Sequence, residues 1–264
     1  MVGYALGGTR SPGGVLIPVA VAATRYIRPT REELASVFED LDTEPFRPAD
    51  FFRLDESPDT AFYTSPRFVE HIDAPAVVAL TAYHGEQLTA IAKRLNTAPD
   101  VLDLCSSWVS HIPPTPPLRS CVGVGMNQAE LERNALLGRF LVQDLNVNHH
   151  LDLQDDNFDC ALLQLSIDYL INPVQVMREI ARVLRPGGLL IVSFSNRVFI
   201  DKAVAVWTGK PDIDHIETVG RYITLASADG ACFDVSTLRA TDITPAASAR
   251  KGGDPLYTVT VVAA

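Results

Sequence analysis

From residue 101 onward, short apolar runs alternate with segments whose apolar positions recur every three or four residues. A run that is almost entirely apolar is typical of a strand buried on both faces, whereas the segments between the runs have the spacing of amphipathic helices. Strands that alternate with helices predict a mostly parallel sheet with helices on both faces. The five predicted strands are "VLDLC", "SCVGVG", "RFLVQDL", "FDCALLQL" and "GLLIVSFS".

Local signals place the helices between these strands. Asn127 is a candidate N-cap and Glu130 follows three residues later, which predicts a capping box at the start of "NQAELERNALLG". Pro173 lies in the first turn of "NPVQVMREIARVL", and the "RPGG" that follows predicts a sharp helix stop and a turn. Two more helices are expected, over about 198–207 and 214–225.

The C-terminal segments differ in character. "ACFDVSTLRATDI" and "PLYTVTVVAA" are predicted to be two strands joined by a turn around "ARKGGD". A connection of this length pairs its strands antiparallel. We therefore predict an α/β fold: a Rossmann-like open sheet, mostly parallel with an antiparallel last strand, with helices on both faces and an N-terminal helical extension.

The region before residue 99 has a helical pattern of its own. Thr30 followed by Glu33 has the signature of a capping box, and the helix that it opens places Leu34 and Phe38 on one face. A loop rich in proline and aromatic residues follows, and a second helix is expected over 74–95. The chain then divides into an N-terminal extension (1–30), a helical cap on the substrate side (31–98) and a sheet domain (99–264).

Composition narrows the classes of partner. The chain of 264 residues carries a formal net charge of −10 and has no basic stripe, which argues against a nucleic-acid partner. No apolar stretch is long enough to cross a membrane. The four cysteines are scattered and the histidines lack metal-ligand spacing, so neither a disulfide framework nor a metal site is expected.

Residues 1–31 contain arginine but no Asp, Glu or Lys, around the apolar run "VLIPVAVAA". This is the composition of a transit peptide for a mitochondrion or a plastid. Pro18 interrupts the apolar run. A non-cleaved extension of a cytoplasmic protein is the interpretation that we favour.

Polar residues follow each predicted parallel strand, among them Asp103, Asp144 and Ser166. Open α/β sheets bind ligands outside the carboxyl ends of their strands. We therefore expect these residues to line one cleft.

Taken in order, "VLDLC", "VGVGMNQAEL", "VQDLN" and "FDCALLQLSIDYL…VMREIARVLRPGGLLIVSFS" resemble the class I S-adenosylmethionine-dependent methyltransferases, in particular the type 11-like group. The most specific piece is the last, in which an Asp-bearing strand, a helix and an "LRPGG" turn lead into the fifth strand. The resemblance covers about 101–264 and implies that the domain 99–264 binds S-adenosylmethionine. "FYTSPRFVEHID" and "SSWVSHIP" resemble a smaller group of this family that brings no known substrate.

The resemblance also implies roles for individual residues. Asp103 would support the loop around the methionine part of the cofactor. Asp144 would accept a hydrogen bond from the adenine amino group, beside the backbone amide of Leu145, and Ser166 would begin the segment that faces the methyl group. The other cofactor-binding residues expected are those of the first loop and the second strand end: Cys105, Ser106, Ser107, Met126 and Asn127.

Two departures from the family pattern affect these roles. Serines replace the usual glycines of the first loop; they do not adopt positive φ freely, but Ser106 and Ser107 add hydroxyl donors for the methionine carboxylate. Gly125 stands where an Asp or Glu usually holds both ribose hydroxyls, which leaves Asn127 as a weaker substitute. The alternatives are that the serines cap a short helix and that Asp144 is a turn residue.

Arg67 is a further candidate to bind a carboxylate of the cofactor or the substrate, and His71, one helical turn away, would face the cleft with it. His111 is the candidate general base, because the pKa of histidine lies near neutrality. Tyr63 and Tyr169 are candidates for the pocket of the methyl acceptor. The alternatives are an exposed Arg67, a surface His111 and two core tyrosines.

Methyl transfer from a sulfonium has a neutral leaving group and needs mainly alignment, so the lack of a catalytic triad is no argument against it. We predict an S-adenosylmethionine-dependent methyltransferase that acts on a small molecule in the cytoplasm, as a monomer or homodimer. One alternative is a protein that binds S-adenosylmethionine or S-adenosylhomocysteine without transfer. Another is an NAD(P)-dependent oxidoreductase, prompted by "GVGMNQ", which leaves "LRPGG" unexplained.

Overall fold

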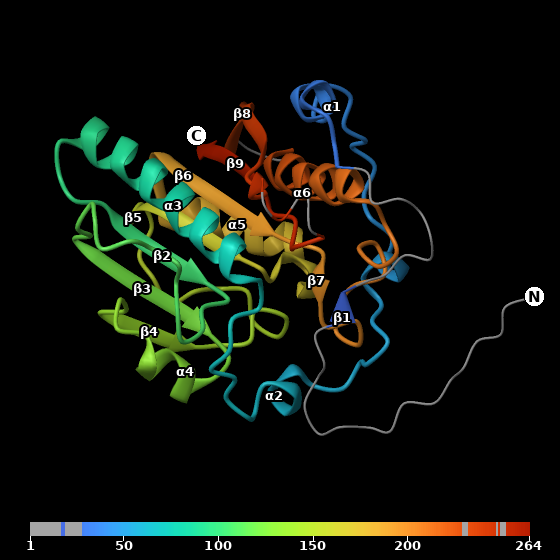
Figure 1. Ribbon diagram of the computed structural model, residues 1–264, viewed down its shortest axis with the longest axis horizontal. Helices are drawn as coiled ribbons and strands as arrows, with labels where there is room; N and C mark the ends of the chain where they lie inside the picture. The colour runs from blue at the N-terminus through green and yellow to red at the C-terminus, as the bar shows by residue number, and fades with distance from the viewer. Residues whose placement is uncertain (1–16, 19–27, 229–231, 247, 249–251) are drawn as a thin grey trace, which may run out of the picture.

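A seven-stranded sheet forms the centre of the computed structural model, which describes residues 17–18, 28–228, 232–246, 248 and 252–264. The strand order is β4-β3-β2-β5-β6-β9-β8, as Figure 1 shows. Neighbours from β4 to β6 are parallel, whereas β9 runs antiparallel to both β6 and β8. The predicted Rossmann-like sheet with an antiparallel last strand is confirmed. The strands are β2 (Asp100–Leu104), β3 (Ser120–Gly125), β4 (Arg139–Val142), β5 (Phe158–Gln164), β6 (Leu184–Phe194), β8 (Phe233–Asp242) and β9 (Tyr257–Ala263).

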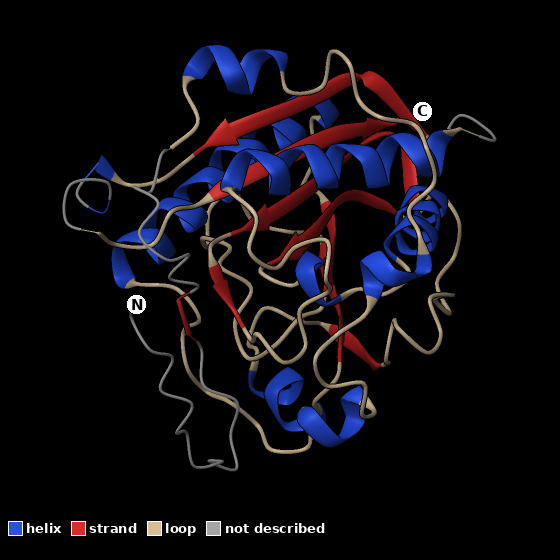
Figure 2. Cartoon of the chain, turned by 90° about the vertical axis from the view of Figure 1, so that its right-hand side faces the viewer, coloured by secondary structure: helices blue, strands red, loops and turns tan. Residues whose placement is uncertain are grey.

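Helices cover both faces of the sheet, as the continuous apolar strands predict (Figures 1 and 2). Successive residues of a strand point to opposite faces. Leu102 and Leu163 therefore join the cluster under α5 and α6, whereas Val101 and Leu162 join the cluster under α3. The helices of the described residues are too short or too polar to span a membrane. The covering helices are α3 (Ala74–Leu95), α5 (Pro173–Val183) and α6 (Asp212–Ser227), and the short α4 (Gln128–Arg133) follows β3.

The first described helix, α1 (Arg31–Ser36), begins with the predicted capping box. Thr30 Oγ1 accepts from Glu33 N at 3.2 Å, and Glu33 Oε2 accepts from Thr30 N at 2.7 Å. The chain after α1 packs on α6, where a Cβ on Gly220 would lie 2.5 Å from Phe38 Cε1. A glycine at this point of α6 therefore lets the N-terminal segment approach the core.

Buried charges anchor the irregular segment between α1 and α3, which contains η1 (Pro48–Phe51) and α2 (Asp59–Phe62). The Asp59 carboxylate accepts from Arg53 Nη1 at 2.8 Å and from Asn146 Nδ2 at 2.9 Å. Lys202 Nζ lies 3.2 Å from the same carboxylate, although the lysine is only 1% exposed. These contacts join the segment to the loops that follow β4 and β7 (Arg197–Val198).

Three predictions of local structure need correction or comment. The helix expected over 198–207 is wrong: turns follow β7, and Val204 N and Val206 N donate across the chain to Asp168 O and Asp50 O. The helix stop expected at "RPGG" is confirmed, because α5 ends at Val183, and the segment lies inside β6, where the pairing with β5 jumps from Leu184 to Leu189 and Gly187 has a φ of 78°. Apart from β1 (Ile17–Pro18), which pairs with β7, the segment 1–27 lies outside the described residues, and so do the predictions made on it.

Candidate cofactor and active site

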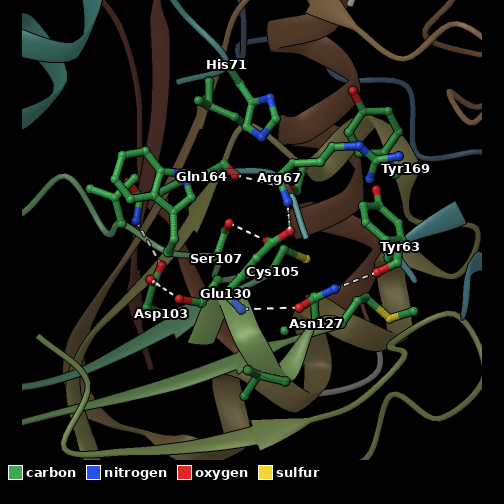
Figure 3. Close-up of a pocket in the computed structure, with 18 of the residues that line it drawn as sticks. Tyr63, Arg67, His71, Asp103, Cys105, Ser107, Asn127, Glu130, Gln164 and Tyr169 are labelled. Atoms are coloured by element: carbon green, nitrogen blue, oxygen red, sulfur yellow. Dashed lines mark hydrogen bonds between the residues drawn. The ribbon is translucent and has the colours of Figure 1, made fainter. Parts of the chain in front are cut away.

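One cleft opens at the carboxyl ends of β2, β3, β4 and β5, the edge where open α/β sheets bind ligands. The segment from Asp59 to Ile72 forms the opposite wall, together with Arg197 and Phe199. Figure 3 shows side chains from these elements pointing into a common space. The structure brings together every residue that the sequence predicted for the site, and their roles stay predictions: Tyr63, Arg67, Asp103, Cys105, Ser106, Ser107, His111, Met126, Asn127, Asp144, Leu145, Ser166 and Tyr169.

Asp103 is the hydrogen-bond centre beneath the first loop. Its carboxylate is buried and accepts from Ser106 Oγ at 2.6 Å, Ser110 Oγ at 2.7 Å and Gln164 Nε2 at 2.8 Å. Burial raises the pKa of Asp103 to about 6, although these hydrogen bonds favour the ionised form. The geometry suits a residue that supports the loop instead of touching a ligand.

The first loop needs no glycine, because Cys105 takes the left-handed conformation with a φ of 52°. His111 (φ 45°) and Leu165 (φ 52°) do the same, and all three line the cleft. A side chain makes this conformation costly, and such strain concentrates at functional sites. The serines that follow Cys105 therefore do not have to adopt positive φ.

Gly125 is glycine because the first loop crosses directly over it. A Cβ at this position would lie 2.2 Å from Ser106 O, and Ser106 N donates to Val124 O at 2.8 Å. Moving the loop would break this hydrogen bond. The path of the first loop thus excludes the carboxylate that the family pattern places at the end of β3.

Both loop hydroxyls are engaged by carboxylates. Ser106 Oγ donates to Asp103, and Ser107 Oγ donates to Glu130 Oε2 at 2.5 Å. Neither hydroxyl proton is free for the methionine carboxylate, so the predicted donor role would require these bonds to be exchanged. Each hydroxyl oxygen still keeps lone pairs toward the cleft.

The capping box predicted for α4 is half right. Asn127 is the N-cap, and its Oδ1 accepts from Glu130 N at 3.2 Å. The carboxylate of Glu130, however, does not return to the N-cap. It turns toward the cleft, where Oε1 accepts from Arg67 N at 2.7 Å.

Asn127 also ties the opposite wall to the sheet. Its Nδ2 donates to Tyr63 O at 2.9 Å and to Thr64 O at 3.2 Å, as Figure 3 shows for Tyr63. Both amide protons are thus in use, and only the second lone pair of Oδ1 is left for a ribose hydroxyl. This is less than the substitute role that the sequence predicted.

Asp144 follows β4 with half of its carboxylate available. Oδ1 accepts from Asn146 N at 2.9 Å, and its second oxygen has no hydrogen bond to the described residues. Its backbone oxygen also accepts from Val147 N and Asn148 N, so Asp144 is a turn residue as well. The free oxygen is an acceptor of the kind that the adenine amino group needs, beside the buried Leu145.

Arg67 is held among aromatic rings. Its guanidinium lies 4.5 Å from the ring centre of Phe62, 5.5 Å from Phe199 and 5.8 Å from Tyr63, and Nη2 donates to Phe62 O at 3.0 Å. Arg67 and His71 both line the cleft, as expected, but the residues between them are not helical. The predicted carboxylate contact would have to be made from this aromatic setting.

His111 is buried, so the alternative of a surface histidine is wrong. Burial lowers the pKa of His111 to about 4, below the neutral value expected from the sequence, and also lowers the pKa of His71. Glu70 Oε2 lies 3.5 Å from His111 Nε2, and His84 Nδ1 lies 2.9 Å from His111 O. The imidazole is therefore neutral at physiological pH, and its low pKa makes it a weak proton acceptor.

Both tyrosines line the cleft, but only Tyr169 is also part of a buried cluster, whereas Tyr63 is half-buried. Tyr169 is buried, and its hydroxyl accepts from Phe199 N at 2.9 Å. Burial raises the pKa of Tyr63 far above its usual value, so this phenol stays protonated. Ser166 Oγ donates to Gln164 O at 2.9 Å.

The wall residues that sequence reasoning missed include Glu130, Gln164, Glu70 and Phe199. Gln164 ends β5, so the rule used for the other strand ends would have found it. Glu130 was assigned to the capping box, which hid its second possible direction. Phe199 gave no signal, because it comes from the turn that was predicted to be a helix.

Comparison with known proteins finds a methyltransferase domain within the sheet region. A family model described as "Methyltransferase domain" matches residues 115–192, which include β3, β4, β5, α5 and most of β6. This part of the chain is therefore similar to a methyltransferase domain.

Two relatives match short segments of this chain. Methyltransferase GfsG of Streptomyces halstedii is 39% identical over 74 residues, which cover 26% of this chain and 27% of that protein. A malonyl-[acyl-carrier protein] O-methyltransferase of Marinomonas sp. is 27% identical over 66 residues, covering 25% and 24%. The chain thus spans about a quarter of the length of these relatives. The crystal structure of an S-adenosylmethionine dependent methyltransferase from Mesorhizobium loti covers 67% of this chain and 96% of its own, at 16% identity and a TM-score of 0.45.

Proposed function

We propose that this chain binds S-adenosylmethionine in the cleft and transfers its methyl group to a small molecule. The observation that carries the proposal is the arrangement of the strand ends around one cleft, with Asp103 beneath the first loop and Asp144 presenting a free carboxylate oxygen. The methyltransferase domain over 115–192 supports the same function.

S-adenosylmethionine supplies an activated methyl group whose departure leaves a neutral thioether. The residues of this chain then have to bind and align. Asp144 and the Leu145 amide would take the adenine, and the Cys105–Ser107 loop held by Asp103 would take the methionine part. His111, neutral and next to Glu70, would accept a proton from an acceptor that carries one.

The cover over the cleft favours a small acceptor. Trp108 Nε1 donates to Val69 O at 3.2 Å, and Asn127 and Glu130 hold the same segment farther along. A side chain on a folded protein would have to pass this cover, whereas a free small molecule would not. The free cysteines suit a reducing compartment, and we propose that the protein acts in the cytoplasm as a monomer or homodimer.

Calorimetry with S-adenosylmethionine, S-adenosylhomocysteine and NADPH tests the cofactor. We expect both adenosyl ligands to bind and NADPH to fail. Asp144→Ala should abolish adenosyl binding, because the adenine loses its acceptor, whereas the exposed Asp152→Ala should not change it. Binding of NADPH alone would refute the proposed function, and unchanged affinity in Asp144→Ala would refute the adenine site.

A protein that binds the cofactor without transfer is the second candidate, favoured by the engaged hydroxyls of Ser106 and Ser107. Release of S-adenosylhomocysteine in the presence of alcohols, phenols, amines and carboxylates separates the two. Turnover with any of them supports transfer. Tight adenosyl binding without turnover across all four classes would favour the second candidate.

A further inference from the structure

The ribose of the proposed cofactor finds no acceptor where the family pattern provides one. Gly125 has no side chain, and the Ser106 carbonyl leaves no room for one. The amide protons of Asn127 are both donated to the opposite wall. A vicinal diol donates two hydroxyl protons, and a carboxylate is the best partner for such a pair because it only accepts.

Glu130 is the carboxylate nearest to this gap along the chain. It lies in the first turn of α4, just beyond Gly125, and is buried in the cleft wall. Figure 3 shows its carboxylate between Ser107 and the Arg67 segment, facing the same space as Asn127. The side chain therefore approaches from the helix, along a path that the first loop does not block.

Two contacts fix the Glu130 carboxylate and leave half of its capacity unused. Oε1 accepts from Arg67 N at 2.7 Å, and Oε2 accepts from Ser107 Oγ at 2.5 Å. An ionised carboxylate offers about four lone-pair sites. Each oxygen therefore keeps one acceptor site for a further hydrogen bond.

A purely structural role, in which Glu130 only joins the Arg67 segment to the first loop, does not explain why this residue is an acid. A glutamine would accept from Arg67 N with its oxygen and donate to Ser107 Oγ with its amide. None of the cationic side chains in the described residues forms an ion pair with Glu130, and a buried carboxylate with unfilled acceptor sites is costly. An acceptor-only group with spare lone pairs is what a donor-rich ligand requires.

We propose that Glu130 is the ribose-binding residue of this cleft and that its carboxylate accepts from both hydroxyls of the adenosyl ribose. Ser107 and the Arg67 amide act as positioning groups that hold the carboxylate toward the diol. This inference rests on the proposed function, because it requires an adenosyl ligand in the cleft.

Calorimetry with S-adenosylhomocysteine and its 2′-deoxy and 3′-deoxy counterparts tests the assignment without knowledge of the methyl acceptor. We expect the wild-type protein to bind each deoxy compound about tenfold or more weakly, since each lacks one hydrogen bond to a charged group. Glu130→Gln should bind S-adenosylhomocysteine more weakly and discriminate little among the three ligands. This loss of discrimination is a readout that a merely structural role would not move.

Two variants serve as controls. Glu132→Gln changes an exposed acid of the same helix and should behave as wild type. Ser107→Ala removes a positioning contact but keeps the carboxylate, so we expect a moderate loss of affinity with discrimination retained. Where Glu130→Gln binds too weakly to measure, Glu130→Asp keeps the charge but withdraws it by one methylene, and it should discriminate less than wild type. Circular dichroism confirms that each variant is folded.

The outcomes separate this inference from the proposed function. Failure of the wild-type protein to bind S-adenosylhomocysteine refutes the proposed function itself. Binding by wild type without discrimination, or full discrimination retained by Glu130→Gln, overturns the assignment of Glu130 and leaves the proposed function standing. Discrimination that disappears with the carboxylate supports the assignment.

Discussion

Asp103 combines deep burial with three hydrogen bonds, and this combination gives the fold a pH dependence at a single residue. Its pKa rises from the usual 3.8 to about 6, because burial disfavours the charged form more than the hydrogen bonds favour it. The folded state therefore holds the proton more tightly than the unfolded chain does. Stability from this group is fully present at low pH and falls as the pH rises through the window from about 4 to about 6.

Replacing Asp103 with asparagine should remove this dependence. We expect the free energy of unfolding of Asp103→Asn, relative to wild type, to shift in favour of the variant by roughly 2 kcal/mol between about pH 4 and pH 6. Urea denaturation at a series of pH values measures this difference. A difference that stays constant across the window would contradict the raised pKa.

The position of a site residue can be predicted from the sequence more readily than the direction of its side chain. Strand ends follow from the apolar pattern, so Asp103, Asp144 and Ser166 could be placed at one edge without coordinates. The direction of a side chain depends on partners far away in the sequence. Glu130 turned to Arg67 instead of its own N-cap, and the lowered pKa of His111 comes from its burial and from the neighbouring His71.

At the scale of elements, the sequence predicts a helix correctly where the segment contains its own N-cap residue and a regular spacing of apolar residues. The helix predicted over 74–95 is α3 without change, and the Thr30 capping box opens α1. The helix prediction for 198–207 failed, because the apolar residues of this segment pack against distant parts of the chain. Its backbone amides donate to the carbonyls of Asp168 and Asp50 instead of to one another. Such cross-chain hydrogen bonds leave no periodic trace in the sequence.

In the buried cluster of Arg53, Asp59 and Lys202, we predict which of two substitutions costs more stability. Asp59→Asn removes the buried carboxylate that Arg53 and Lys202 share and leaves them only the more exposed Glu56 and Asp55, so it should cost about 3 kcal/mol of stability. Lys202→Met leaves the Arg53–Asp59 pair in place, so its cost should be smaller. Urea denaturation of both variants gives the order, and a larger cost for Lys202→Met would show that the lysine, not the aspartate, is the centre of the cluster.

At the scale of the whole molecule, the N-terminal third and the sheet share one core. Leu88 and Ile91 of α3 pack in the same cluster as Val101, Leu162 and Ile191. The division at residue 98 stays a prediction about roles, but these contacts bear on how the two parts fold.

A fragment that starts at residue 99 lacks α3 and exposes one apolar face of the sheet. We expect it to show no cooperative thermal transition by circular dichroism, whereas the full chain should unfold in one step, since the fragment cannot bury that face. Cooperative unfolding of the fragment near the temperature of the full chain would show that residues 31–98 are an independent unit.

The crossing of the first loop over Gly125 also constrains how such a site can evolve. An acid at position 125 is blocked until the loop takes another path, and a rerouted loop gains nothing for the ribose until an acid appears there. The two positions are therefore epistatic: neither substitution is useful alone. If Glu130 binds the ribose, a protein with this acid retains a ribose contact while the loop path and position 125 change one after the other, so the cofactor is kept at each step.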